Sequence, residues 1–277
     1  MANANNSLLE QVYNVREDDQ LLSQVAHVVC VLIPRGFMAA GFGTDRQLLT
    51  IHFRGYNNKK PVWDLDFFEQ LTQQEPLLAA KEKVKGVFMG NTKFLVVPDE
   101  LYQQNDANEW MRRLFFIEPG EIITPYRSGN YAPVYVQAMP VNITELVKIN
   151  YRKADIAPLP LHHLQAPEST GIYAHCCIIP GSAFITLFSN GRLLWHNCIP
   201  CVSGEDIAFA IKQYCQQNNM DAAAIAMHCD ALAGAEFPII NELTQYFKGI
   251  TTGKGETISG RWDASASLAQ QLLACVS

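Results

Sequence analysis

The chain has 277 residues, of which 48% are apolar and 17% charged, and its net charge at pH 7 is −6. This size and composition predict a globular protein of two domains and exclude a disordered chain. No apolar run reaches the roughly 20 residues of a membrane helix, and the start does not have the pattern of a signal peptide. The basic residues are scattered, which argues against nucleic acid as the main binding partner. Eight cysteines without an export signal indicate free thiols and a cytoplasmic location.

The first half of the chain predicts a strand meander followed by helices and strands. Residues 1–20 are polar and are expected to lack regular structure, whereas 27–53 alternates as three short strands. The further elements expected are the helices 63–83, 108–116 and 142–152 and the strands 84–89, 94–97 and 134–138. Pro76 is expected to bend or break the first of these helices. The proline-rich segment 153–169 is the expected crossover between the halves.

The second half predicts a similar order of elements. Three strands are expected over 175–199, with a polar turn at 189–192. Ser203-Gly-Glu-Asp206 has the pattern of a capping box, so a helix should begin there, and Asn218-Asn219 should end it. The elements expected afterwards are a buried strand over 222–228, a helix with Pro238 in its first turn, and a last helix over 265–276.

The two halves share a motif at the end of their first strand. It is Pro34-Arg35-Gly36 in the first half and Pro180-Gly181-Ser182 in the second, each followed by two further strands. This repetition predicts two like α/β domains in which Val29–Phe53 superimposes on Cys177–Ile199. Two such domains facing one another would form a cleft that admits a small ligand.

Several short segments carry a resemblance to an uncharacterised bacterial family with the actin-like ATPase fold. They are Leu48-Leu49, Phe67-Phe68, Leu95-Val96-Val97-Pro98, Asn190-Gly191-Arg192-Leu193 and Leu243-Thr-Gln-Tyr-Phe247. The chain is also similar in plan to the actin-like cytoplasmic proteins of the type IV pilus and type II secretion machineries. The resemblance implies two related ribonuclease H-like domains with mixed sheets in an actin-like arrangement, over residues 22–160 and 161–277.

Active members of that superfamily carry an acidic residue on the first strand of each half, in a pattern like Asp-x-Gly-x-x-Thr, and the carboxylate holds magnesium through water. Here Pro34 and Pro180 stand near the positions of those acids. The resemblance leaves Gly181, Ser182 and Gly234 to contact a nucleotide. We therefore predict no catalytic residue, no metal ligand, negligible ATP turnover and contact with a protein partner, with ATP or another nucleotide as the alternative to no cofactor.

Two enzymatic alternatives remain open. One is an ATP-dependent phosphotransferase in which Asp206 or Asp230 replaces a missing acid. The other is a thiol or metal protein built on Cys198-Ile-Pro-Cys201, which has the form of a thioredoxin-type pair. Such a pair needs a helix N-terminus at its first sulfur, but the capping box places the helix after both cysteines. We therefore expect these thiols to be reduced, metal-free and not catalytic.

The histidines offer weaker patterns. If residues 192–198 form a strand, His196 and Cys198 share a face, which would allow a metal site with Cys201, and His175 or Cys176 as a further ligand. The adjacent His162 and His163 would point opposite ways on an extended chain, so one is expected to point inward and the other to be exposed.

Overall fold

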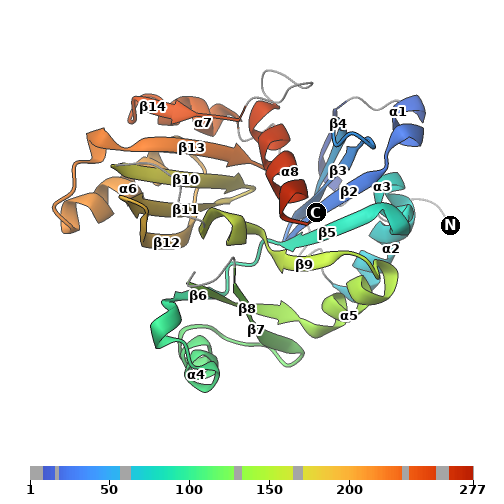
Figure 1. Cartoon of the computed structure of the whole chain (residues 1–277), viewed down its shortest axis with the longest axis horizontal. Helices are drawn as coiled ribbons and strands as arrows, with labels where there is room; N and C mark the ends of the chain where they lie inside the picture. Colours follow the sequence, from blue (N-terminus) through green and yellow to red (C-terminus); the bar gives the residue numbers. More distant parts are fainter. Residues whose placement is uncertain are drawn as a thin grey trace. The chain divides into compact units, whose positions relative to one another are not determined.

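The computed structural model describes residues 9–15, 19–56, 64–127, 133–164, 171–232, 237–253 and 262–276. The chain forms two compact units, namely Met1–His162 with Gln271–Ser277, and His163–Gln270 (Figure 1). The first unit thus includes the last residues of the chain, whereas the sequence prediction assigned them to the second domain. The division into domains at residues 160 and 161 stays a prediction.

The first unit is built on a six-stranded mixed sheet with the strand order β1-β4-β3-β2-β5-β9. Its strands are β1 (Leu9–Val15), β2 (His27–Ile33), β3 (Gly36–Phe42), β4 (Leu48–Tyr56), β5 (Val84–Met89) and β9 (Asp155–Pro158). Its helices are α1 (Asp19–Gln24), α2 (Leu65–Gln74), α3 (Pro76–Ala79) and α5 (Val141–Asn150), with short 3₁₀ turns at Lys81–Lys83 and Leu159–Leu164. Apolar side chains of β2, β3 and β5 pack against α2, α3 and α5 in one core, which includes Phe68, Leu77 and Ile143.

A small antiparallel sheet is inserted between β5 and α5. It consists of β6 (Phe94–Val97), β7 (Glu121–Arg127) and β8 (Val134–Pro140) in the order β6-β8-β7, with α4 (Gln104–Leu114) and a 3₁₀ turn at Asp99–Leu101. Its buried core among the described residues consists of Val97, Ala107, Met111, Val134, Val136 and Ala138. At its base, the Asn91 side chain donates to the Ala138 carbonyl (2.7 Å), and Gln137 Nε2 donates to the carbonyls of Met89 and Asn91 (3.3 Å each).

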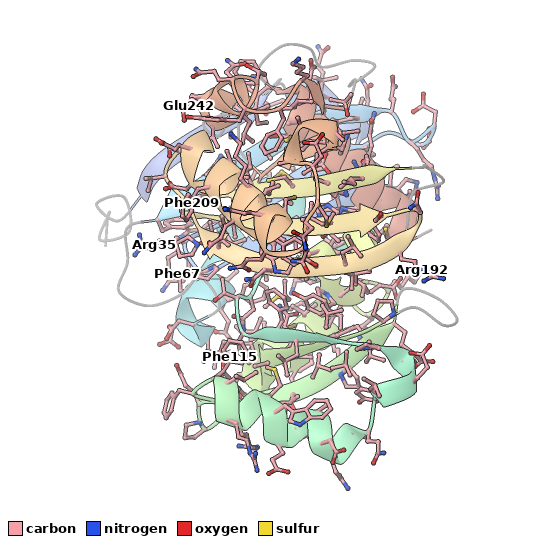
Figure 2. All side chains as sticks on the ribbon, turned by 90° about the vertical axis from the view of Figure 1, so that its left-hand side faces the viewer. Arg35, Phe67, Phe115, Arg192, Phe209 and Glu242 are labelled. Atoms are coloured by element: carbon pink, nitrogen blue, oxygen red, sulfur yellow. The ribbon has the colours of Figure 1, made fainter. Side chains whose placement is uncertain are left out.

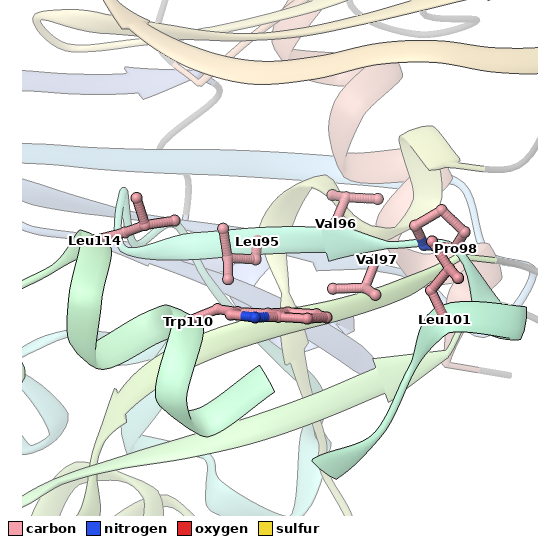
Figure 3. Close-up of a pocket in the computed structure, with 7 residues that line it drawn as sticks. All are labelled: Leu95, Val96, Val97, Pro98, Leu101, Trp110 and Leu114. Atoms are coloured by element: carbon pink, nitrogen blue, oxygen red, sulfur yellow. The ribbon is translucent and has the colours of Figure 1, made fainter. Parts of the chain in front are cut away.

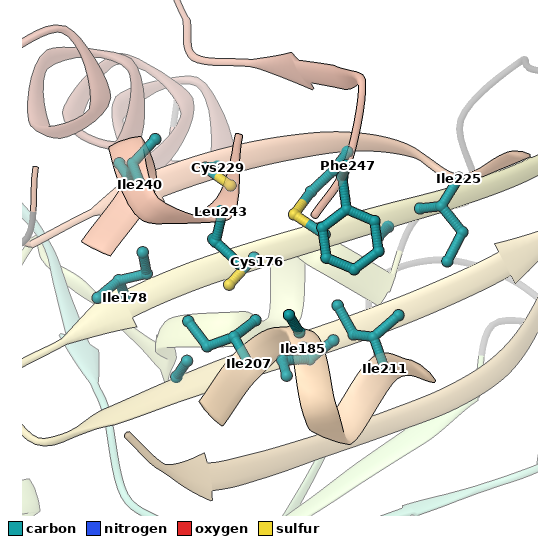
Figure 4. Packing of buried hydrophobic residues seen from close by; sticks show 14 of the residues in the cluster. Cys176, Ile178, Ile185, Ile207, Ile211, Ile225, Cys229, Ile240, Leu243 and Phe247 are labelled. Carbon is teal, nitrogen blue, oxygen red and sulfur yellow. The ribbon is translucent and has the colours of Figure 1, made fainter. Parts of the chain in front are cut away.

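The second unit is built on a five-stranded mixed sheet with the strand order β12-β11-β10-β13-β14. Its strands are β10 (Ile172–Ile179), β11 (Ser182–Ser189), β12 (Arg192–Pro200), β13 (Ala226–Ala231) and β14 (Gly249–Thr251). Its helices are α6 (Gly204–Gln217) and α7 (Phe237–Leu243), with a 3₁₀ turn at Ala222–Ala224, and α8 (Asp263–Cys275) runs from this unit into the first. Figure 4 shows α6 and α7 packing on one face of this sheet through Ile207, Ile211, Ile240 and Leu243.

The two units repeat one pattern of strand pairing. Ile33 pairs with Gly36 across the β2–β3 turn, and Ile179 pairs with Ser182 across the β10–β11 turn. The first three of these strands are antiparallel in each unit, and the next strands, β5 and β13, run parallel to β2 and β10. This confirms the predicted meanders and mixed sheets. When the two turns are aligned on these pairs, Ile33 corresponds to Ile179, and Val29 therefore corresponds to His175. The sequence prediction had aligned Val29 with Cys177, two residues further along.

Five strands depart from the sequence prediction: β7 and β14 are absent from it, and β1, β9 and β13 differ from it for identifiable reasons. β1 lies within the segment expected to lack structure, because β4 supplies a partner edge that completes its backbone hydrogen bonds. β9 lies within the expected crossover and pairs with β5, so its strand character comes from tertiary contact. β13 begins at Ala226 instead of residue 222, because Asp221 accepts a hydrogen bond from the Ala223 N–H (2.9 Å) and caps a 3₁₀ turn there.

Other predicted elements are confirmed. Pro76 interrupts the first helix and stands in the first turn of α3, where its missing N–H costs nothing. Asn190 and Gly191 both have positive φ values, 48° and 75°, as a two-residue hairpin turn of type I′ requires. The capping box at Ser203 begins α6, and Asn218 ends it.

Candidate functional site

The hairpin turns that the sequence singled out join β2 to β3 and β10 to β11. Pro34 and Arg35 form the first turn, and Arg35 is exposed (Figure 2). Pro180 and Gly181 form the second, where the φ of Gly181 is +77°, as a type II turn needs at its third position. Neither turn contains a carboxylate, the side chain that magnesium prefers among its protein ligands.

The predicted nucleotide contacts are only partly placed. Ser182 begins β11, and its hydroxyl donates to the carbonyl of Gly181 (2.7 Å). The same carbonyl accepts the backbone N–H of Cys201 (3.2 Å). The structure therefore places Gly181 and Ser182 in one turn, while Gly234 lies outside the described residues. A role for these three residues in nucleotide binding stays a prediction.

Asp206, the first candidate for a replacement acid, caps α6. Its Oδ2 accepts the backbone N–H groups of Val202 (2.9 Å) and Ser203 (3.1 Å) and lies 3.1 Å from the Ser203 hydroxyl. These hydrogen bonds lower the pKa of the Asp206 carboxyl, led by the one from Val202. The carboxylate thus belongs to the capping box at the N-terminus of α6.

Asp230, the second candidate, lies near the end of β13 and is fully buried, with three histidines around its carboxylate. His175 Nε2 is 2.7 Å from Oδ2, His228 Nε2 is 3.2 Å from Oδ1, and His163 Nε2 is 3.7 Å from Oδ2. Burial alone would raise the pKa of Asp230, but hydrogen bonds from His163, His175 and His228 outweigh burial and hold the pKa well below its usual value. We call these four residues the His–Asp cluster.

The other histidines have separate roles. His196 Nδ1 lies 2.8 Å from the Thr186 hydroxyl, and burial, followed by the nearby His175, lowers the pKa of His196 to about 3. It is therefore neutral at physiological pH. One of the two adjacent histidines, His163, is buried, as was predicted for one of the pair, but the other, His162, is half-buried instead of exposed. The reason is that the segment forms a 3₁₀ turn in which His162 Nδ1 lies 2.8 Å from the Leu159 carbonyl.

The cysteine pair does not have the surroundings of a reactive thiol. Cys198 lies on β12 and Cys201 follows it, both before the start of α6 at Gly204. Burial, and after it the neighbouring Cys201, raises the pKa of the Cys198 thiol to about 12. A redox or nucleophilic cysteine needs the opposite shift, because the thiolate is the reactive form. Cys201 belongs to the apolar core of the second unit.

An apolar hollow of about 250 Å³ lies on the small sheet, between β6 and α4 (Figure 3). We call it the β6 groove, and its lining residues are Leu95, Val96, Val97, Pro98, Leu101, Trp110 and Leu114. The indole of Trp110 lies along the groove and faces Leu95 and Val97. Trp110 and Leu114 are one helical turn apart, so the sequence alone could not distinguish them from a buried stripe.

Comparison with known proteins identifies the fold. A family model described as "Protein of unknown function (DUF3822)" matches residues 32–250. No curated protein matches the chain. A Bacteroides thetaiotaomicron protein described as having an actin-like ATPase fold and unknown function is similar, with a TM-score of 0.66 and 12% identity over 83% of this chain and 91% of that one.

Two structures from bacterial machineries are also similar. The PilM–PilN type IV pilus biogenesis complex gives a TM-score of 0.52 and 14% identity, with 92% of this chain and 99% of that one covered. The cytoplasmic domain of EpsL, from the type II secretion system of Vibrio cholerae, gives 0.47 and 7%, with 90% and 95% covered. The chain thus has the actin-like ATPase fold with two related ribonuclease H-like domains, as the sequence predicted.

Proposed function

This chain belongs to the DUF3822 family of proteins of unknown function, and we propose that it acts by binding another protein in the β6 groove and not by turning over ATP. The observation that carries the proposal is the exposure of large apolar side chains around one hollow. Leu101 and Leu114 are each 64% exposed, and Trp110 is 37% exposed. Single exposed apolar residues are ordinary, but their gathering in one depression is typical of interaction sites.

The shape of the groove favours an extended apolar segment as its occupant. β6 is an edge strand of the small sheet, since β8 is its partner on one side and the described residues supply no strand on the other. An edge strand presents backbone donors and acceptors that a peptide can pair with as an added strand. Apolar side chains of such a peptide would enter the hollow beside Trp110, a residue type enriched among binding hot spots.

A similar structure supports a role in protein contact. The PilM–PilN structure is, by its own description, a complex of two proteins in type IV pilus biogenesis. At 14% identity the likeness shows the fold alone, so the partner of this chain is not inferred from it. It does support the view that a protein with this fold can function by binding another protein.

The arrangement of carboxylates supports the absence of ATP turnover. Neither hairpin turn provides an acid, and both candidate replacements are committed elsewhere. Asp206 holds the capping box of α6, and Asp230 is fully buried among three histidines. A triphosphate without a magnesium ligand would lack its counter-ion, which makes its binding costly.

The proposal includes a cytoplasmic location. All eight cysteines are free thiols, which is the usual state in a reducing compartment. Among the described residues, none of the helices has the length and apolar character needed to span a bilayer.

Binding is tested by placing a photo-crosslinking amino acid at position 114 in cells and, as a control, at position 209. Phe209 of α6 is 67% exposed, so it offers an equally accessible apolar site outside the groove (Figure 2). A partner crosslinked from 114 and not from 209 is then purified and titrated. Trp110→Ala should weaken its binding by about 30-fold or more, while Phe209→Ala should not. Equal affinities of all three proteins would refute the groove as the binding site.

ATP turnover is tested separately by measuring phosphate release with magnesium or manganese. We expect none above the background of the buffer. A turnover near the common range of about 1 per second, abolished by Asp206→Ala or Asp230→Ala, would establish the phosphotransferase alternative.

A further inference from the structure

The His–Asp cluster joins three separate segments of the second unit. His175 comes from β10, His228 and Asp230 come from β13, and His163 comes from the segment that opens the unit. The two strands run parallel, with His175 opposite His228 and Cys177 opposite Asp230. Because side chains alternate along a strand, these four residues share one face of the sheet. His163 therefore meets the sheet at a group of imidazoles around one carboxylate.

The hydrogen bonds of His228 identify its ring as a cation. The Thr251 hydroxyl donates to the Met227 carbonyl (3.3 Å), so its oxygen accepts from His228 Nδ1, 3.4 Å away. Nε2 of the same ring donates to Asp230 Oδ1 (3.2 Å), and a ring that donates from both nitrogens is an imidazolium. Burial alone would lower the pKa of His228, but the hydrogen bond and the charge of Asp230 outweigh burial and raise it.

The ion pair of His228 and Asp230 persists in mild acid. Because the pKa of His228 is raised, its stabilisation is complete below the ordinary value of 6.5 and is lost as the pH rises through the folded value. The pKa of Asp230 is lowered, so its stabilisation is complete above 3.8 and is lost as the pH falls through the folded value. Between these limits the one carboxylate of the cluster is matched by one imidazolium.

A second imidazolium would have no further counter-charge. The other titratable side chains on this face of the sheet are Tyr173 and Cys177 on β10 and His196 on β12, and none of them is a carboxylate. Burial, followed by the charge of Asp230, raises the pKa of Tyr173 to about 12, so the phenol is neutral. His162, which precedes His163 in the chain, is also an imidazole.

The remaining two rings of the cluster are in contact with each other. The ring centroids of His163 and His175 lie 3.4 Å apart, and those of His175 and His228 lie 5.0 Å apart. Imidazole in general takes up a proton near pH 6.5. In mild acid a proton added to this stack would place two like charges side by side in a largely buried site, which is costly.

The turn that carries His163 is the part able to relieve this cost. β10 and β13 are interior strands of the five-stranded sheet, paired on both sides. His163 lies instead in a 3₁₀ turn of six residues, Leu159–Leu164, and such turns have poorer hydrogen-bond geometry. Movement of the turn would bring its imidazole into water while the sheet remains intact.

We propose that the His–Asp cluster is a pH-sensitive latch on the segment that opens the second unit. At neutral pH, with His228 as the single imidazolium, the cluster holds His163 on the sheet. A further proton, taken up in mild acid by the stacked rings of His163 and His175, releases the turn.

The experiment measures hydrogen exchange in the full chain at pH 7.5, 6.5 and 5.5, with a chelator present to exclude metal ions. After correction for the pH dependence of chemical exchange, amides of 159–164 should lose protection by about tenfold per pH unit once the proton is taken up. Amides of α6 should keep theirs, which excludes general acid unfolding. Unchanged protection of 159–164 down to pH 5.5 would overturn the proposal.

Histidine NMR and variants assign the protons. At pH 7 the ring of His228 should give the nitrogen shifts of an imidazolium in the wild-type protein, and it should lose its proton at lower pH in Thr251→Val. His163→Phe keeps a ring against His175 but has no proton to gain, so 159–164 should stay protected at pH 5.5. His196→Gln is the matched control, because His196, with a pKa of about 3, does not titrate in this range and its variant should respond like the wild type. A neutral His228 at pH 7, or the wild-type loss of protection in His163→Phe, would refute the latch.

Discussion

Replacing Met111 by alanine should release α4 from the small sheet while the rest of the first unit stays folded. Met111 is fully buried and belongs to a core whose other described members are alanines and valines. A buried methionine replaced by alanine costs about 2–5 kcal/mol. The remaining buried side chains of this core are small, and the other apolar residues that pack against it are only partly buried. Local opening would therefore become more frequent by a factor of about 30 or more, since 1.4 kcal/mol is tenfold.

Hydrogen exchange measured by mass spectrometry tests this. Amides of 94–97 and 104–114 should exchange faster in Met111→Ala, while those of β2 and β5 keep the wild-type rate. Met139→Ala is the matched control, because Met139 is equally buried but belongs to the large core of the first unit. It should speed exchange in β2 and β5 instead. The reasoning would be refuted if the two variants gave the same exchange pattern, or if Met111→Ala left α4 unchanged.

The remaining predictions concern the second unit and the proposed function. Ser203→Ala should lower the free energy of unfolding by about 1 kcal/mol in urea titration, since it removes a helix cap; no change would contradict the capping box. Because the pKa of Asp206 is lowered from 3.8 in the folded state, its stabilisation is complete above that pH and is lost as the pH falls through the folded value, so wild type and Asp206→Asn should converge in acid. Cys198, with a pKa of about 12, should react with iodoacetamide at neutral pH at least about a hundredfold more slowly than a model thiol, as followed by peptide mass spectrometry. Trp110→Ala should weaken partner binding, as described above.

Local signals in the sequence predicted elements of both units. The capping box at Ser203, the turn at Asn190-Gly191 and the break at Pro76 each depend on a few neighbouring residues, and each is confirmed. β1 and β9 were missed because their strand character depends on partner strands distant in sequence. β7, in which every residue is half-buried or exposed, has too weak an apolar pattern to be recognised.

The candidate sites were harder to predict for the same reason. His175 and Asp230 lie 55 residues apart in the sequence, and the parallel pairing of β10 with β13 brings them together. The one local signal was the spacing of His228 and Asp230, which places both on one face of a strand. In the β6 groove, Trp110 and Leu114 had the spacing of buried residues, and only the structure shows that they are exposed.

The small sheet has a consequence for how such a chain can diversify. It begins and ends at neighbouring points of the host, held together by Asn91 and Gln137, and it has its own core. A piece of this kind can be exchanged for another without rebuilding the six-stranded sheet, so one scaffold could acquire new partners by recombination. The exchange has a definite limit along β8, because Ala138 packs in the small core and the next residue, Met139, packs in the large one. A hybrid joined before Met139 should keep its scaffold intact, whereas one joined after it removes part of the scaffold's own interior.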